Sequence, residues 1–366
     1  MDKRRLEELL AHLETHLECW RQFNGFVLKA KTGEFDSSDE AEFLEIKSNL
    51  VQQLEVIRNY IEEGGPDRNA THALIGSAPS IASIRQMGDT AQRTLESNWH
   101  EIFVAWQTVL GQIKAQGLNL GIPELLAQLE NHVEYWKRFR TFLALAQSKK
   151  FTEEDELEFL EVKSGMVQEL EIILGAIEDG APPRQDIHDL ITNAASIRYL
   201  SELGDNSLRT LESNWHQIYL EWQGVLGQLK LAQKELSIDQ LIAQLENHIE
   251  GFKQFNQFLQ QARTGKFSDD DEEQFLELKS SLAQELEMIR GSIDEGAPSR
   301  DVVLDVIGSG PSLKFIRGLT DASQRSLENN WHKVFLEWQS VLGKVKVIAQ
   351  QQGGRKKGFF SRLFGG

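Results

Sequence analysis

Hydrophobic side chains recur at helical spacing in the first thirty residues. They fall every three or four positions, at Leu6, Leu9, Leu10, Leu13, Leu17, Trp20, Phe23 and Val27. This spacing places them on one face of an amphipathic α-helix. The letters TGEF interrupt the pattern, and the segment Asp36–Asp39 follows. It fits a capping box, because a side-chain acceptor is followed three residues later by an acid.

Two more long helices are predicted before residue 119. The second carries Phe43, Lys47, Leu50, Leu54, Ile57 and Ile61 on one seam. Gly-Gly-Pro at 64–66 ends it, because glycine suits a helix C-cap and proline starts a new segment. Residues 67–88 look like one or two short helices. The last helix has one face formed by Trp99, Ile102, Phe103, Trp106, Val109, Leu110 and Ile113.

The whole pattern occurs three times. The segment LESNWHEIFVAWQTVLGQIK at 95 returns as LESNWHQIYLEWQGVLGQLK at 211 and as LENNWHKVFLEWQSVLGKVK at 327, 116 residues apart each time. The same offset relates three prolines, Pro66, Pro182 and Pro298. A period this long is typical of a duplicated domain, whereas solenoid repeats are shorter.

These patterns predict an all-α fold of three tandem copies of a roughly 116-residue three- or four-helix bundle, plus a short C-terminal amphipathic helix. The expected domains are residues 1–119, 122–235 and 238–350, followed by a flexible linker and tail at 351–366. No segment shows the alternation of a β-strand. Between the first two copies, GLNLGIPE should end a helix, and Ser237–Gln240 could cap the start of the third copy.

Composition places the chain among globular proteins, with 40% hydrophobic and 26% charged residues. No run of eighteen apolar residues is present, and the beginning, MDKRRLEELLAHLETH, lacks the features of a secretory signal. The single cysteine, Cys19, favours a reducing compartment. We therefore expect a cytoplasmic protein.

The net charge of −17 is unevenly distributed. The last twelve residues contain four cationic side chains and no acidic one, so the rest of the chain stands at −21. Such a body repels nucleic acid, and no nucleic-acid partner is expected.

Several polar residues recur in all three copies. Three histidines fall on the apolar side of the first helix of each copy: His16, His132 and His248. Three lysines lie in the seam of the second helix: Lys47, Lys163 and Lys279. Pairs four residues apart lie on the last helix: Glu96 and His100, Glu212 and His216, and Glu328 and His332.

These polar residues have two interpretations. One is a metal or ligand site in each bundle, but di-iron bundles use Glu-x-x-His on facing helices, and the spacing here is Glu-x-x-x-His. The favoured interpretation is a polar layer, with each histidine hydrogen-bonded and each lysine stem packed along the core. Hairpin symmetry places Lys47 level with Trp20, so we expect a lysine over an indole. Neither a metal nor a cofactor is predicted.

Enzyme motifs are sparse. There is no Walker loop, no nucleophile elbow and no G-x-G-x-x-G after a strand. Tyr135 and Gly251 stand at the positions equivalent to Cys19, which argues against a nucleophile copied with the domain. The acidic stretch FSDDDEEQF lacks the D-x-D-x-D-G of an EF-hand, and helix capping accounts for it. A non-enzymatic protein is expected.

The last eleven residues, KKGFFSRLFGG, combine apolar and basic side chains. Phe359, Phe360, Leu363 and Phe364 share one face of a helix, while Lys356, Lys357 and Arg362 reach its polar side and rim. This is the pattern of a helix that lies in the headgroup plane of a membrane.

The segment resembles the C-terminal membrane-targeting sequence of the MinD family of bacterial cell-division ATPases, and FtsA proteins end in a similar helix. The resemblance covers about eleven of 366 residues, and no MinD ATPase domain is present. It implies that the four apolar side chains insert and that the three basic ones meet anionic lipid. Ser361 stands where a further basic residue is usual.

The expected anchor is weak. Basic residues at an anionic surface contribute roughly 1 kcal/mol each, and partial burial of four large apolar side chains adds about 4–8 kcal/mol. Ordering the segment offsets much of this, which leaves dissociation constants from roughly millimolar to ten micromolar. Stable attachment then needs several tails, through self-association or a polyvalent partner.

The sequence therefore favours a peripheral scaffold or adaptor on the inner face of the cytoplasmic membrane, with a protein partner still to be found. The alternative is a soluble ligand- or metal-binding helical protein whose tail docks in a groove on another protein.

Overall fold

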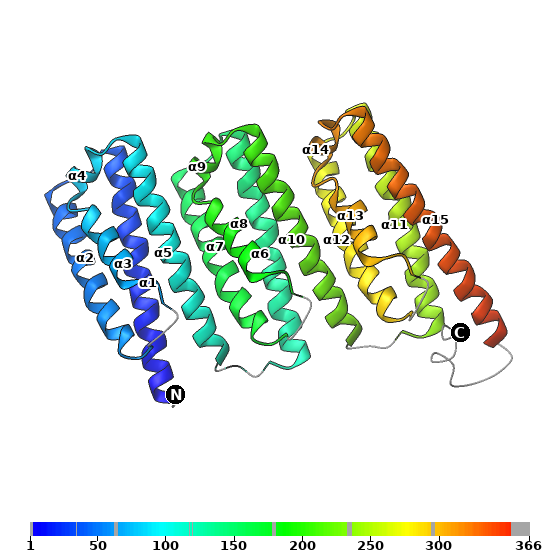
Figure 1. Cartoon of the computed structure of the whole chain (residues 1–366), viewed down its shortest axis with the longest axis horizontal. Helices are drawn as coiled ribbons and strands as arrows, with labels where there is room; N and C mark the ends of the chain where they lie inside the picture. The colour runs from blue at the N-terminus through cyan, green and yellow to red at the C-terminus, as the bar shows by residue number, and fades with distance from the viewer. Residues whose placement is uncertain are drawn as a thin grey trace. The chain divides into compact units, whose positions relative to one another are not determined.

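A computed structural model describes residues 3–33, 35–61, 65–116, 118, 120–177, 181–232, 236–293 and 297–352. Every regular element in these ranges is an α-helix, as the sequence predicted (Figure 1). Long helices alternate with pairs of short ones. The long helices are α1 (Lys3–Thr32), α2 (Ser37–Arg58), α5 (Asp89–Gln116), α6 (Ile122–Ser148), α7 (Glu153–Leu174), α10 (Asp205–Ala232), α11 (Ile238–Thr264), α12 (Asp269–Gly291) and α15 (Asp321–Gln352).

Short helices occupy the segments where the sequence predicted one or two of them. They are α3 (Arg68–Ser77), α4 (Ile81–Arg85), α8 (Arg184–Asn193), α9 (Ile197–Glu202), α13 (Arg300–Gly308) and α14 (Leu313–Arg317). Each of α4, α9 and α14 starts at a serine whose hydroxyl accepts a backbone hydrogen bond three residues on. Each serine cap therefore marks where the second short helix of a pair begins.

The predicted helix starts are confirmed by their caps. Capping boxes join Asp36 to Asp39, Thr152 to Asp155 and Ser268 to Asp271. Ser237 and Gln240 form a fourth at the start of α11. In each, the cap side chain and the residue three positions on satisfy two backbone N–H groups that the helix leaves without partners.

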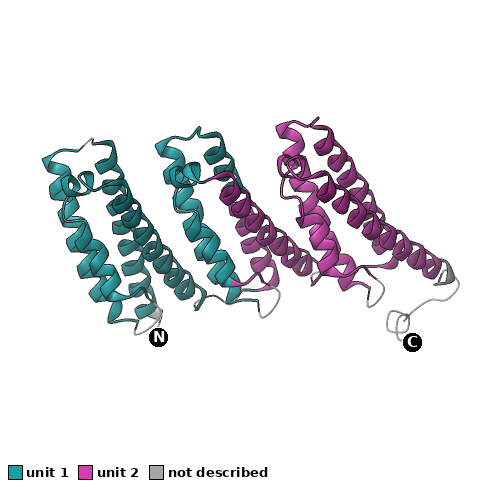
Figure 2. Ribbon diagram, turned by 45° about the horizontal axis from the view of Figure 1, so that its top comes forward, with its two compact units in different colours: residues 1–120, 137–178, 184–203 teal, residues 121–136, 179–183, 204–366 magenta. Residues whose placement is uncertain are grey.

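The chain divides into two compact units (Figure 2). The first comprises residues 1–120, 137–178 and 184–203, and the second comprises 121–136, 179–183 and 204–366. The division passes through α6, so it does not follow the domain boundaries expected from the sequence, which stay a prediction.

Each unit has an aromatic core. In the first, α1, α2 and α5 bury Trp20, Phe23, Phe43 and Trp106 almost completely. In the second, α11, α12 and α15 enclose a cluster that includes Phe252, Phe255, Phe275 and Trp338. Large aromatic side chains supply much of the apolar area removed from water, which stabilises the packing of these helices.

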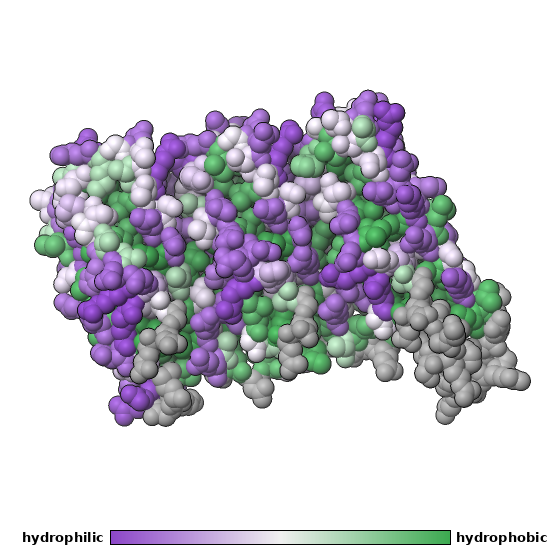
Figure 3. All heavy atoms as spheres, in the orientation of Figure 1, coloured by the Kyte–Doolittle hydropathy of each residue, from purple (hydrophilic) through white to green (hydrophobic). Residues whose placement is uncertain are grey.

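On the face shown in Figure 3, hydrophilic side chains are interspersed with hydrophobic ones. Within the described ranges, no helix is both long enough and apolar enough to cross a bilayer.

Candidate functional site

The three recurring lysines are buried, as a polar layer requires. Lys47, Lys163 and Lys279 are 8%, 2% and 0% exposed. Each Nζ donates to two consecutive backbone carbonyls just beyond a short helix. The distances are 2.9 and 2.6 Å to Ala78 and Pro79, 2.8 and 2.6 Å to Ala194 and Ala195, and 2.7 and 2.8 Å to Gly310 and Pro311.

These carbonyls lie at the C-terminal ends of α3, α8 and α13, where helix dipoles favour a positive charge. The ammonium groups therefore stabilise the ends of the short helices. The aromatic ring beneath Lys47 is Phe43, 4.8 Å away, and not the expected indole of Trp20. Phe43 lies one turn earlier on the same helix, which brings its ring under the lysine stem. Phe159 and Phe275 lie 4.6 and 4.4 Å from the other two lysines.

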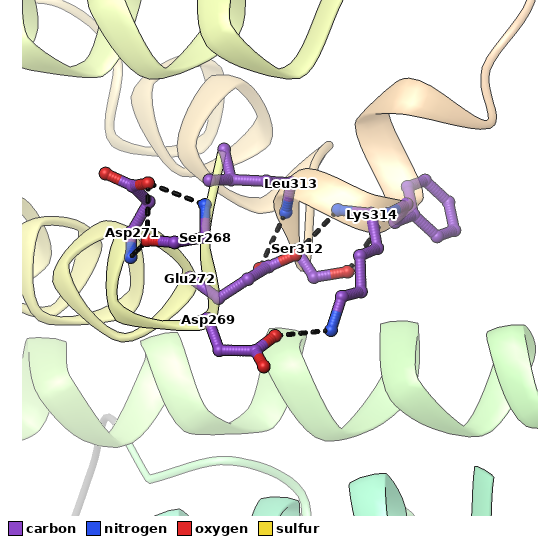
Figure 4. Close-up of polar contacts among 8 residues, drawn as sticks. Ser268, Asp269, Asp271, Glu272, Ser312, Leu313 and Lys314 are labelled. Atoms are coloured by element: carbon purple, nitrogen blue, oxygen red, sulfur yellow. Dashed lines mark hydrogen bonds and ion pairs between the residues drawn. The ribbon is translucent and has the colours of Figure 1, made fainter. Parts of the chain in front are cut away.

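A glutamate two turns before each lysine holds the start of the following short helix, a role that sequence reasoning missed. Glu272 accepts from the backbone N–H groups of Leu313 at 2.9 Å and Lys314 at 2.8 Å (Figure 4). Glu40 and Glu156 make the same pair of bonds, with distances between 2.7 and 3.0 Å. The signal was present, because a glutamate recurs seven residues before each of the three lysines.

Together the glutamate and the lysine form a charged clamp. In the second unit, α12 supplies Glu272 to the N–H groups of α14 and Lys279 to the carbonyls after α13. Each charge faces the end of a helix that it complements. The clamp thus fixes the connection between two short helices.

The histidines on the first long helices are also buried. Nε2 of His16 accepts from the indole N–H of Trp20 at 3.0 Å, and His132 accepts from Trp136 at 2.9 Å. Burial lowers the pKa of His16 and of His132 to about 3. Both rings are therefore neutral at physiological pH.

His248 differs because phenylalanine, Phe252, occupies the position of the donor tryptophan. Its Nδ1 lies 3.1 Å from a carboxylate oxygen of Glu285. Burial lowers the pKa of His248, and the hydrogen bond to Glu285 opposes that shift.

His100, on α5, contacts Lys163 of α7, and His216, on α10, contacts Lys279 of α12. His100 Nε2 lies 3.4 Å from Lys163 Nζ, and His216 Nε2 lies 3.0 Å from Lys279 Nζ. Burial first, and then the charge of Lys163, hold the pKa of His100 well below its usual range. Burial also lowers the pKa of Lys163 to about 7, against the opposing field of Glu156.

The glutamates that precede these histidines do not join them. Glu96 pairs with Lys31 at 2.5 Å, and Glu328 pairs with Arg263 at 3.3 Å. Glu212 is half-buried, whereas His332, the third histidine of the set, is exposed. Among the described residues, no three His, Cys, Asp or Glu side chains gather in a group that could hold a metal ion.

A cavity of about 190 Å³ lies in the first unit, beside Lys163. Its lining includes Arg93, Glu96, Arg198, Tyr199 and Glu202. Arg93 and Glu202 form an ion pair of 2.8 Å, so the lining carries both signs of charge.

No protein-family model, no curated protein and no solved structure matches this chain.

The contact between α5 and α7 is built around paired glutamines and a glycine. Gln168 donates its amide to Gln107 at 2.5 Å, and Lys114 donates to Gln168 at 3.1 Å. A Cβ added to Gly111 would lie 2.8 Å from Cβ of Glu171 and 2.9 Å from the carbonyl oxygen of Gln168. Only glycine allows the two helices to approach so closely.

The pair α10 and α12 repeats this arrangement. Gln284 donates to Gln223 at 2.5 Å, and Lys230 donates to Gln284 at 2.9 Å. A Cβ on Gly227 would collide with the backbone of Gln284. Both contacts bury a glutamate that is paired with an arginine: Glu171 with Arg184, and Glu287 with Arg300.

The seven residues predicted to bind membrane, Lys356, Lys357, Phe359, Phe360, Arg362, Leu363 and Phe364, lie outside the described part of the chain.

Proposed function

We propose that the protein is a non-enzymatic scaffold or adaptor, held on the cytoplasmic face of the membrane by residues 356–366. Its body is three tandem copies of one helical domain that present surfaces to a protein partner or to other copies of the chain. The observation that carries the proposal is the tail sequence. At helical spacing, its four large apolar residues share one face and its three basic residues reach the polar side and rim.

Repeated hydrogen bonds support the tandem-domain part of the proposal. The indole N–H of Trp99 donates to the carbonyl of Trp20 at 2.9 Å, and that of Trp215 donates to Trp136 at 2.9 Å. Trp331 donates to Phe252 at 2.7 Å. Donors and acceptors are each spaced by 116 residues, the period of the sequence pattern.

The non-enzymatic part draws support from the partners of the recurring polar residues. The lysines hold backbone carbonyls, the glutamates hold backbone N–H groups, and two of the buried histidines accept from tryptophans. These contacts account for the recurrence by stability alone, since buried polar groups need partners.

Liposome sedimentation tests the anchor. The full-length protein should sediment with vesicles that contain anionic lipid, and deletion of residues 356–366 should abolish this. Phe360→Glu should reduce binding by at least about tenfold, because it removes an inserting aromatic side chain and places a charge on the apolar face.

Ser361→Glu is the matched control, because it changes the charge equally outside the four apolar positions. It should weaken binding by less, roughly 1 kcal/mol per charge near the surface. Equal loss in both glutamate variants would argue against insertion. If the clustered full-length protein ignores anionic vesicles, the membrane proposal is wrong.

A ligand-binding protein is the second candidate, favoured by the cavity beside Lys163. It requires a small molecule in the purified protein, visible by native mass spectrometry. Such a ligand should be lost on Arg198→Ala, because Arg198 lines the cavity.

A further inference from the structure

The outer faces of α2 and α15 are equivalent, by the 116-residue offset, to the faces that are buried in the α5–α7 and α10–α12 contacts. The α2 face consists of Leu44, Ser48, Val51, Gln52 and Glu55, and it also includes the edge of Lys47, which is 8% exposed. The α15 face consists of His332, Leu336, Gln339, Gly343, Lys344 and Val347. Each lies within one compact unit, the α2 face in the first and the α15 face in the second.

Exposure on the α2 face contrasts with burial at the equivalent internal positions. Leu44 is 64% exposed, whereas Leu160 and Leu276, at the same place in α7 and α12, are 8% and 7% exposed. The side chain of Glu55 is 44% exposed, and that of its counterpart Glu171 is 1% exposed. The α2 face is thus equivalent to the face of α7 that is buried against α5. No helix among the described residues covers the α2 face.

The α15 face shows the complementary contrast. Leu336 is 52% exposed, whereas its counterparts Val104 on α5 and Leu220 on α10 are 5% and 2% exposed. His332 and Gln339 are exposed, although their counterparts on α5 and α10 are buried. A Cβ added to Gly343 would meet no described atom within 4 Å.

We infer that the α15 face of one copy of this chain docks on the α2 face of another copy, head to tail. The α5–α7 and α10–α12 contacts are the template, because both halves of that contact are present on the same chain and no described residue covers them. The occupant of each face is therefore a second copy of the chain.

The template assigns the contacts across this interface. Gln52 pairs with Gln339, as Gln168 pairs with Gln107. His332 lies over Lys47, as His216 lies over Lys279. Gly343 admits the backbone of α2, in the way that the internal glycines admit their partner helices.

One substitution adds charge complementarity. In the α10–α12 contact, the amide of Gln228 donates to Glu287 at 3.1 Å. Lys344 stands at the position of Gln228, and Glu55 at that of Glu287. The head-to-tail contact therefore gains an ion pair between Lys344 and Glu55, which favours this pairing over the contact of two α2 faces.

One position is less suited. Asn59 stands where Gly175 and Gly291 approach α5 and α10. Its side chain must turn aside, so the contact between copies is weaker than the internal ones. This fits a reversible assembly.

Such a contact is heterologous, so it extends into open chains or closes into a ring. It deepens the proposed scaffold, on which it rests for its purpose, because assembly would bring many weak tails together. The contact itself is testable without membranes, so its failure and that of the anchor are distinguishable.

Analytical ultracentrifugation of the full-length protein tests the inference. The average mass should rise with concentration from 41.6 kDa to beyond that of a dimer. Gly343→Leu should keep the protein monomeric, because the new side chain meets the backbone of α2 in the partner. Asn330→Leu is the matched control: Asn330, Asn98 and Asn214 are all exposed, so added bulk there leaves assembly unchanged.

Mixing two blocked variants identifies the pairing. Leu44→Glu blocks the α2 face and leaves the α15 face intact, whereas Gly343→Leu does the reverse. Each alone should be monomeric, and an equimolar mixture should form dimers that grow no further. The inference is overturned if the wild type stays at 41.6 kDa up to about 1 mM, if Gly343→Leu assembles normally, or if the mixture stays monomeric.

Discussion

At the residue scale, the buried histidines make stability depend on pH. His16 is neutral in the folded protein, with its pKa lowered by burial from 6.5 to about 3. Between these two values the unfolded chain binds a proton that the folded chain does not. Stability is therefore full above pH 6.5 and falls as the pH drops through this window.

We expect the free energy of unfolding to fall by about 2 kcal/mol between pH 6.5 and pH 5 through His16 alone. Urea denaturation of the wild type and of His16→Gln, at both pH values, measures this. The glutamine keeps an acceptor for Trp20 but does not titrate. The free energy of unfolding of His16→Gln should therefore fall by about 2 kcal/mol less than that of the wild type on acidification. His332→Gln, at an exposed position, controls for removing a histidine. Equal acid sensitivity of wild type and His16→Gln would refute the assignment.

The recurring residues could be found in the sequence, but their partners could not. Burial of His16, Lys47 and Lys163 followed from their place on apolar helix seams. Their acceptors lie in loops that the chain reaches only after it folds back, 31 residues later for Lys47 and Ala78. The 3.6-residue period of a helix identifies a buried face but not the backbone atoms that will lie opposite it. For that reason Trp20 was expected where Phe43 lies.

At the scale of the elements, the clamp on α12 controls how α14 is attached. Glu272 satisfies two backbone N–H groups at the start of a five-residue helix, which is too short to be stable alone. Charge-assisted bonds of this kind are stronger than neutral ones.

Glu272→Ala should lower the free energy of unfolding by about 2–4 kcal/mol, because it leaves two donors without their acceptor. Glu272→Gln, which keeps one acceptor oxygen, should lose about half as much. Urea denaturation followed by circular dichroism measures both changes. Glu273→Ala is the control, since Glu273 is the exposed neighbour on the same helix. A loss no greater than that of the control would show that the clamp is dispensable.

The positions of the helices could be predicted from the sequence more completely than which helices pack against each other. Capping residues and the 3.6-residue period located the long helices and the two short ones at 67–88. The face of α5 that carries His100 packs on α7, beyond the three- or four-helix bundle expected to contain it. The spacing of apolar residues predicts that a face is buried. It does not distinguish burial against a helix of the same bundle from burial against a further helix.

At the scale of the whole molecule, the proposed membrane attachment and the proposed self-association would reinforce each other. A single tail of the predicted strength binds weakly, and the rest of the chain, at −21, is repelled by anionic lipid. In the proposed assembly, a tail would be kept near the membrane by the tails of neighbouring copies, which would raise its effective concentration there.

Gly343→Leu should therefore weaken binding of the full-length protein to anionic vesicles by at least about tenfold, although it lies outside residues 356–366. Vesicle sedimentation over a range of protein concentrations measures this, and the wild-type curve should be steeper because assembly at higher concentration brings more tails together. Asn330→Leu should follow the wild type. The substitution replaces an exposed helical glycine and should leave thermal stability unchanged or higher, so a folding defect is separable from lost binding. Unchanged vesicle binding in a variant shown to be monomeric would mean that one tail suffices, and that assembly serves something other than attachment.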